Sequence, residues 1–197
     1  LVFAPVTTPG TEMEATDLDS LAEAACELLA GGETALGDAL AALAGGSGGA
    51  RPKIHVGFDA NGRVSLGSGE VPPGYEAWMV KFRGTGDPVD IGPIEAAYAD
   101  MARAAGLTTS AHRLIPARSG APWFATRRFD RTPEGGRVHM VSLAGAIEAP
   151  SDRPSVGYDA FLRATLAITR NAEDVAETFR RMIFNILASN RDDHTRQ

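Results

Sequence analysis

The order in which two hydrophobic patterns follow each other constrains the fold of this chain more than any other feature. Between about residues 51 and 129, short segments with strand signals alternate with turns rich in Gly, Pro and Asn. From residue 157 onward, apolar residues recur at helical spacing. This order predicts an α+β fold, in which a small β-rich lobe precedes the start of a helical lobe.

The local patterns give expected bounds for each element. We expect helices at 15–31, with Thr16 as N-cap, and at 33–44, 93–105, 141–146, 157–169 and 172–189. We expect strands at 53–58, 64–66, 76–82, 114–116 and 123–129, with a hairpin turn at 59–62. The last helix is expected to bury Val175, Phe179, Met182, Ile183, Ile186 and Leu187. We divide the chain into a helical part (1–50), a β-rich lobe (51–132) and the start of a helical lobe (133–197).

Charge and cysteine content narrow the class of protein. A net charge of −6 argues against a general nucleic-acid binder. The single cysteine, Cys26, fits a reducing compartment, and its apolar helical setting favours a small buried hydrophobe over a reactive thiol. No apolar run reaches the ~20 residues that span a bilayer, and residues 1–5 do not resemble a signal peptide. We therefore expect a cytoplasmic location, and both ends of the chain look cut.

Two segments of the β-rich lobe carry cations suited to phosphate. The run Gly45–Gly49 precedes Arg51 and Lys53, so its backbone N–H groups can wrap a phosphate. A flexible linker explains such runs more often, and no Walker pattern is present. Lys81 ends an otherwise apolar strand and precedes Glu95 in the next expected helix. Kinases aim a strand lysine at nucleotide phosphates through a helix carboxylate. A solvated strand face and a carboxylate in a first helical turn are the alternatives.

Two further clusters stand where an element ends. In Arg127–Arg131 a strand meets a turn, where backbone groups can bind an adenine edge; a charged strand end is the alternative. In Asn190–His194, which follows the last expected helix, a carboxylate can accept a proton from an attacking hydroxyl. A metal site or a solvated polar helix end would carry the same residues.

Taken in order, these pieces resemble the HipA family, the kinase-like toxins of type II toxin–antitoxin modules. The matching stretches are Gly48–Lys53, Trp78–Phe82, Glu95–Leu107, Arg128–Arg131, and Phe179–Leu187 running into Asn190–His194. Residues 1–5 also resemble the end of the family's N-terminal β subdomain. The resemblance implies a protein-kinase-like fold that uses ATP and Mg²⁺.

The resemblance also implies a role for each site residue. Gly48, Gly49, Ala50, Arg51 and Lys53 would form the loop that covers the phosphates, and Lys81, paired with Glu95, would contact the α/β-phosphates. Arg127 to Phe129 would hold adenine, with Asp130 near the ribose. Asp192 would be the catalytic aspartate, His194 would help to position the nucleotide, and Gln197 would bind Mg²⁺.

The chain departs from the family at three places. Gln197 stands where the family commonly has a magnesium-binding asparagine. The family's second metal-binding aspartate lies beyond the last residue, so the fragment is expected to be inactive. Ser47 fits the family's autophosphorylated loop serine only with a one-residue deletion.

The expected function is that of a serine/threonine protein kinase of the HipA toxin type. Family behaviour implies a HipB-like DNA-binding antitoxin as partner. It also implies a translation-related protein target, such as an aminoacyl-tRNA synthetase, and autophosphorylation. A non-catalytic nucleotide- or protein-binding module is the main alternative, favoured by Gln197. An aminoglycoside-type small-molecule kinase is a second one, and the segment Gly48–Lys53 argues against it.

Overall fold

The computed structural model describes residues 11–13, 18–29, 51–66, 71–118, 120–150 and 156–195. They belong to two compact units: residues 1–100 with 110–138, and residues 101–109 with 139–197. The expected helix at 33–44 and the N-cap Thr16 lie outside the described residues. So do Ser47, Gly48, Gly49, Ala50 and Gln197.

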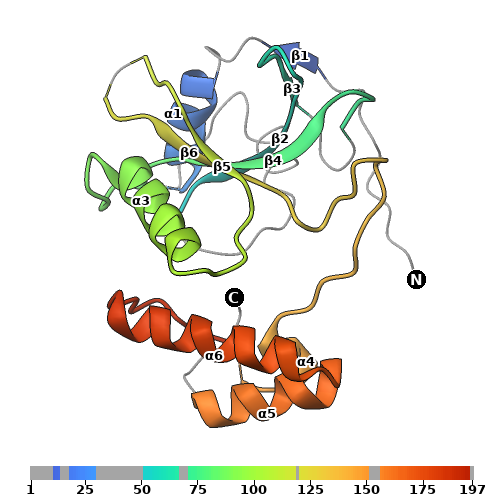
Figure 1. Ribbon diagram of the computed structural model, residues 1–197. Coiled ribbons are helices and arrows are strands. Elements are labelled where there is room, and N and C mark those ends of the chain that lie inside the picture. The colour runs from blue at the N-terminus through green and yellow to red at the C-terminus, as the bar shows by residue number, and fades with distance from the viewer. Residues whose placement is uncertain are drawn as a thin grey trace. The chain divides into compact units, whose positions relative to one another are not determined.

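An antiparallel sheet forms the centre of the first unit (Figure 1). Its strands are β1 (Thr11–Met13), β2 (Lys53–Phe58), β3 (Val64–Leu66), β4 (Glu76–Lys81), β5 (His112–Ile115) and β6 (Trp123–Arg127). Their order in the sheet is β1-β3-β2-β4-β6-β5. The predicted hairpin is confirmed, because β2 and β3 pair antiparallel across the 59–62 turn. The last predicted strand is shorter at its end than expected, since β6 stops at Arg127.

The two faces of this sheet carry different kinds of side chain. Ile54, Val56 and Val80 are fully buried on one face, where they join a core that includes Leu18 and Leu21 of helix α1 (Leu18–Leu29). Side chains alternate along a strand, so Lys53 and Lys81 leave the sheet on the opposite face. Helix α3 (Ile91–Ala104) meets that face through the contact of its Glu95 with Lys81. One face therefore supplies the core, and the other presents charge.

Helix α3 begins at Ile91, before the predicted start at 93, so Gly92 and Pro93 do not break the chain. Proline is tolerated in a first helical turn because its missing N–H has no intrahelical acceptor there. Gly92 is required at its position for a steric reason. A Cβ atom there would collide with the backbone carbonyl of Pro122, just before β6.

Three helices dominate the described part of the second unit: α4 (Leu143–Ala146), α5 (Tyr158–Thr169) and α6 (Ala172–Leu187). Side chains cap two of them: Ser142 accepts a hydrogen bond from the Gly145 N–H, and Asn171 accepts one from the Glu173 N–H. Helices α5 and α6 meet at the hydroxyls of Thr165 and Thr178, whose oxygens lie 3.4 Å apart. These helices match the predicted ones to within three residues at each end.

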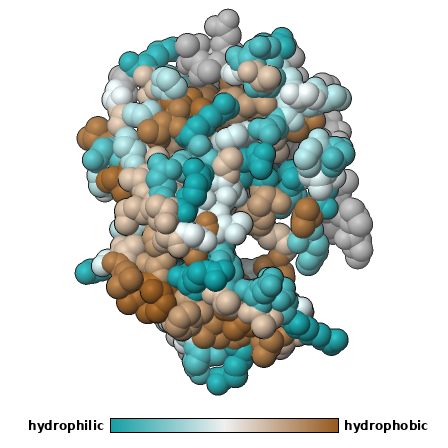
Figure 2. Space-filling view, in the orientation of Figure 1, coloured by the Kyte–Doolittle hydropathy of each residue, from teal (hydrophilic) through white to brown (hydrophobic). Residues whose placement is uncertain are grey.

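The predicted burial of α6 is wrong for most of its apolar face. Val175 and Met182 are half-buried. Four other members of the predicted set are exposed: Phe179, Ile183, Ile186 and Leu187. Helix α6 has one long helical neighbour among the described residues of its unit, and α5 covers only part of its circumference. Figure 2 shows hydrophobic surface over these helices.

The class prediction is confirmed at the level of mixed α and β structure built on an antiparallel sheet. The kinase-like arrangement of lobes stays a prediction, as do the boundaries at 50/51 and 132/133. In the described residues, no helix combines the length and apolarity that crossing a bilayer demands.

Candidate functional site

Lys81 and Glu95, which the sequence singled out separately, form an ion pair. Lys81 ends β4, and its Nζ lies 2.8 Å from Oε2 of Glu95. The ammonium also lies 5.6 Å from the centroid of the Phe124 ring on β6. Because α3 starts at Ile91, Glu95 lies beyond the first helical turn, so its charge is placed by this ion pair and not by the helix end.

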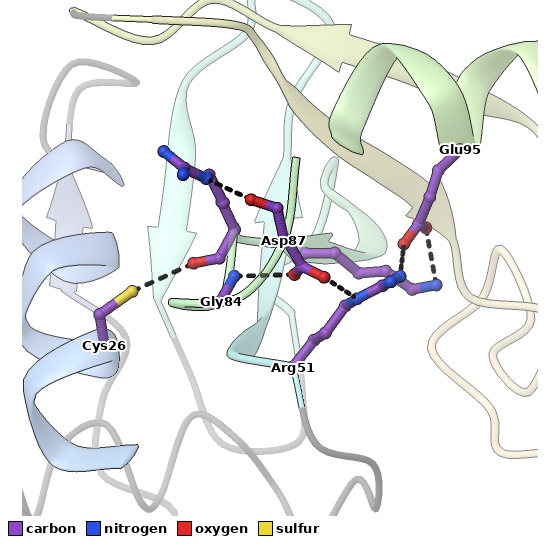
Figure 3. A network of polar contacts seen from close by, with 7 residues as sticks. Cys26, Arg51, Gly84, Asp87 and Glu95 are labelled. Atoms are coloured by element: carbon purple, nitrogen blue, oxygen red, sulfur yellow. Dashed lines mark hydrogen bonds and ion pairs between the residues drawn. The ribbon is translucent and has the colours of Figure 1, made fainter. Parts of the chain in front are cut away.

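Arg51 joins the same pair from the segment before β2, as Figure 3 shows. Its Nη1 lies 3.0 Å from Oε1 of Glu95, and its Nε lies 3.0 Å from Oδ1 of Asp87 in the β4–α3 loop. The carboxylates are well covered, with 15% of the Asp87 side chain and 16% of the Glu95 side chain exposed. We call Arg51, Lys53, Lys81, Asp87 and Glu95 the charged cluster.

Lys53 and Lys81 are the two lysines of the chain, and they stand directly opposite each other on β2 and β4. Burial and the nearby charge of Lys81 lower the pKa of Lys53, because both disfavour a second ammonium there. The cluster holds three cations against two carboxylates. Such an excess of positive charge attracts an anion with several negative oxygens, such as a polyphosphate.

Asp130 lies among cations just after the end of β6. Its carboxylate accepts hydrogen bonds from Nε and Nη2 of Arg128, at 2.9 and 2.7 Å, and from Nη1 of Arg131 at 2.6 Å. The Arg128 hydrogen bond is the main cause that lowers the pKa of Asp130 to about 2. Burial, with a smaller effect of the Arg128 charge, lowers the pKa of neighbouring His55 to about 4. A fixed Asp130 carboxylate therefore holds two guanidinium groups.

The proposed adenine-binding segment has part of its backbone in use. The Arg127 N–H donates to the Ala111 carbonyl at 2.8 Å, and the Arg128 N–H donates to the Ala77 carbonyl at 2.9 Å. The Arg127 side chain lies 3.2 Å from Glu76. Phe129 is 71% exposed. The ribose role of Asp130 and the adenine role of this segment stay predictions.

In the second unit, the loop of residues 190–195, which we call the Asp192 loop, is tied at several points. The Asn190 N–H donates to the Asn185 carbonyl at 2.9 Å, and the Asn190 side chain accepts from the Asp192 N–H at 3.1 Å. The Ala144 N–H donates to the Thr195 carbonyl at 2.8 Å. These bonds use the backbone, so they fix the course of the loop without engaging the Asp192 carboxylate.

Asp192 and Asp193 have different surroundings in this loop. The Asp193 carboxylate accepts a hydrogen bond from the Tyr158 hydroxyl at the start of α5. Burial and this bond raise the pKa of Tyr158. The Asp192 side chain is 85% exposed, and its Oδ1 lies 3.9 Å from Nε2 of His194. Both aspartates are exposed, and the difference between them is that the Asp193 carboxylate is tied to α5 through Tyr158.

The sequence prediction missed Asp87 and Tyr158 as members of these sites. Neither residue belongs to a motif that the sequence singles out. Neither spacing nor periodicity marks a side chain that reaches across to another element. The described residues contain no group of three His, Cys, Asp or Glu side chains that could hold a metal ion.

Comparison with known proteins identifies a family, and it also finds similar proteins among curated sequences and solved structures. The family model of the HipA-like C-terminal domain matches residues 45–197. "Putative kinase Y4dM" of Sinorhizobium fredii is 38% identical over 71 residues, which cover 36% of this chain and 17% of that protein.

A solved structure from Shewanella oneidensis MR-1 contains the toxin–antitoxin system proteins HipA and HipB with operator DNA. It matches with a TM-score of 0.56 and 21% identity, and the match covers 76% of this chain and 38% of that one. At this identity the match shows a shared fold. The chain spans well under half the length of both relatives.

Proposed function

Because the chain belongs to the family of the HipA-like C-terminal domain, we propose that it is part of an ATP-dependent serine/threonine protein kinase of the HipA toxin type. The charged cluster is the observation that carries this proposal. It brings three cations and two carboxylates together beside the paired ends of β2 and β4. Its Lys81–Glu95 ion pair is the arrangement that directs an ammonium at nucleotide phosphates in kinases. The name of the Sinorhizobium relative, "Putative kinase Y4dM", points to the same class.

The chemistry follows from the two sites. Arg51, Lys53 and Lys81 would bind the phosphates of ATP and offset the negative charge that crowds around the transferring phosphoryl group. Asp192 would accept the proton of the attacking serine or threonine hydroxyl, for which its exposed carboxylate is suited. The first and second units would correspond to the small and large lobes of a protein kinase.

Mg²⁺ belongs to this proposal as the ion that neutralises phosphate charge in kinases. Of the predicted ligand set, Gln197 lies outside the described residues. In the described part of the chain, the loop offers two exposed carboxylates, Asp192 and Asp193, and that of Asp193 accepts a hydrogen bond from Tyr158. We therefore assign no step of the reaction to a metal held by these residues.

The partners follow from the relatives. The Shewanella complex contains HipB and operator DNA, so we propose a HipB-like DNA-binding antitoxin for this protein as well. The protein target would be translation-related, such as an aminoacyl-tRNA synthetase. The second candidate function is a nucleotide-binding module without catalysis, which the glutamine at position 197 favours.

Phosphoryl transfer separates the two candidates. The gene product that carries this chain is incubated with γ-labelled ATP, Mg²⁺ and cell lysate, beside its Asp192→Asn and Asp174→Asn variants. Asp174 is an exposed aspartate of the same unit and serves as the matched control. We expect labelling of a protein by the wild type and the control, and a loss of at least ~100-fold in Asp192→Asn. Equal labelling by all three would exclude Asp192 as the base, whereas ATP binding without labelling would favour the non-catalytic module.

A further inference from the structure

The Asp87 carboxylate is held from two sides. The Gly84 N–H donates to Oδ2 at 2.9 Å, and Arg51 Nε donates to Oδ1 at 3.0 Å. The turn closes on itself as well, because the Asp87 N–H donates to the Gly84 carbonyl at 3.1 Å and Arg83 Nε donates to the Asp87 carbonyl at 3.0 Å. Asp87 is therefore a fixed anchor and not a mobile surface carboxylate.

Arg51 is the side chain that this anchor holds (Figure 3). The next residue, Pro52, accepts a hydrogen bond from the Phe82 N–H at 2.8 Å, which fixes the backbone beside the end of β4. The Arg51 side chain is 43% exposed, and its guanidinium bridges Asp87 and Glu95. An exposed arginine side chain loses conformational entropy when it binds a ligand. Because Asp87 and Glu95 bind different nitrogens of Arg51, they restrict its rotamers before a ligand arrives, which lowers this entropy cost.

Asp87 also influences how the two carboxylate oxygens of Glu95 are divided between Arg51 and Lys81. Glu95 binds Arg51 through Oε1 and Lys81 through Oε2. Because Asp87 binds Nε of Arg51, the guanidinium contacts one oxygen of Glu95, and the other oxygen remains bound to Lys81. Without Asp87, the guanidinium can turn both of its donor edges to Glu95 and compete with Lys81 for that carboxylate.

We propose that Asp87 is a positioning residue for nucleotide phosphate binding: through Arg51, it orients the cations of the charged cluster toward a polyphosphate. This inference rests on the proposed function, and it adds a residue that touches neither phosphate nor adenine. It predicts the direction in which the affinity for phosphate changes when Asp87 is substituted. Removing the negative charge of Asp87 makes the cluster more positive, so charge alone would tighten phosphate binding, whereas loss of orientation weakens it.

Nucleotide affinity tests the proposal directly. Isothermal titration of the chain with ATP, ADP and adenosine compares the wild type with Asp87→Asn, Asp87→Glu and Asp90→Asn. Asp87→Asn keeps an oxygen that can accept from Gly84, and Asp87→Glu keeps the charge but moves the carboxylate by one methylene. Asp90, an exposed aspartate of the same loop, is the matched control. We expect both Asp87 variants to bind ATP about 3- to 10-fold more weakly, with adenosine affinity unchanged and the control at wild-type affinity.

A double-mutant cycle with Arg51→Gln shows whether Asp87 acts through Arg51. In that background, Asp87→Asn should change ATP affinity by less than about 2-fold. Wild-type or tighter ATP binding by both Asp87 variants would overturn the proposal, and so would an undiminished loss in the Arg51→Gln background. If the wild type bound adenosine but not ATP, or neither, the proposed function itself would fail. If Asp87→Asn unfolds, Asp87→Glu decides the question alone.

Discussion

The charged cluster of the first unit and the Asp192 loop of the second unit hold their acidic groups in opposite ways. In the cluster, carboxylates and cations bind each other, and no more than 16% of the Asp87 or Glu95 side chain is exposed. In the loop, backbone bonds and the Tyr158–Asp193 contact fix the chain, while the Asp192 side chain is 85% exposed.

This difference predicts how each region responds to substitution. In the cluster, every charge helps to place its neighbours, so one change alters several contacts. In the loop, the course of the chain is set by residues other than Asp192. Nucleotide binding and phosphoryl transfer should therefore be separable: cluster variants affect the affinity for ATP, and loop variants affect the transfer rate.

Lys81→Met should give the largest change in ATP affinity. It removes a cation and with it the Lys81–Glu95 ion pair, so we expect ATP affinity to fall about 10- to 100-fold. The matched control is Arg63→Gln, which also removes a cation from the first unit but pairs with Asp59 outside the cluster. Calorimetric titration of the chain with ATP measures both. ATP affinity that falls equally in the control would show that net charge, and not the cluster, governs binding.

Gly92→Ala should disturb the cluster without touching a charge. The new Cβ would collide with the Pro122 carbonyl, so α3 must move away from the start of β6 and carry Glu95 with it. We expect a loss of about 1–3 kcal/mol in the free energy of unfolding, together with weaker ATP binding. Gly86→Ala is the matched control, because a Cβ there meets nothing within 4 Å. Urea unfolding followed by tryptophan fluorescence reports on this unit, since Trp78 and Trp123 both lie in its sheet. Unchanged stability in Gly92→Ala would mean that α3 adapts at little cost.

Tyr158→Phe should affect the loop alone. It removes the hydroxyl that binds Asp193, so the loop is less firmly held, and we expect the transfer rate to fall about 3- to 10-fold. ATP affinity should stay within about 2-fold of the wild type. Both are measured on the gene product that carries this chain, with Asp193→Asn as a companion that retains an acceptor for the tyrosine. A fall in ATP affinity equal to the fall in rate would contradict the separation of the two regions.

The sequence predicted the elements of this fold better than their packing. Turn residues and apolar spacing are local signals, and they placed the β2–β3 hairpin and the helices α5 and α6. The sequence predicted the start of α3 two residues too late, because glycine and proline usually interrupt a helix, although proline is tolerated in the first turn. The exposure of Phe179 and Leu187 was missed because periodicity shows which face of a helix is apolar, but not what covers it.

For the candidate site, too, the sequence indicated residues with a local signal but not the contacts between distant residues. Lys81, Glu95 and Asp192 stood out because each has an unusual local setting or matches a family motif. Asp87 and Tyr158 have neither. Their importance comes from contacts with Arg51 and Asp193, which are 36 and 35 residues away. Only the tertiary structure brings such pairs together.

The smallest predicted effect concerns pH and His55, a half-buried histidine of β2. Burial lowers the pKa of His55 from its usual 6.5 to about 4, so between these values the unfolded chain binds more protons than the folded one. Stability of the first unit should therefore fall as the pH drops below 6.5. The Asp130 carboxyl, with its pKa lowered to about 2, stabilises the fold above its usual 3.8 and loses this effect only as the pH falls from there toward 2.

The two contributions thus occupy different pH ranges, and the first can be tested by itself. Urea unfolding at pH 7 and pH 5.5 should show a decrease of at most about 1 kcal/mol, reduced by solvent screening at a half-buried site. His55→Gln should remove most of this decrease. His194→Gln, a change at a 45% exposed histidine of the Asp192 loop, should leave it in place, because the loop holds its charged groups in solvent. If both substitutions reduced the pH-dependent decrease in the free energy of unfolding equally, this would contradict the contrast between half-buried His55 in the sheet and exposed His194 in the Asp192 loop.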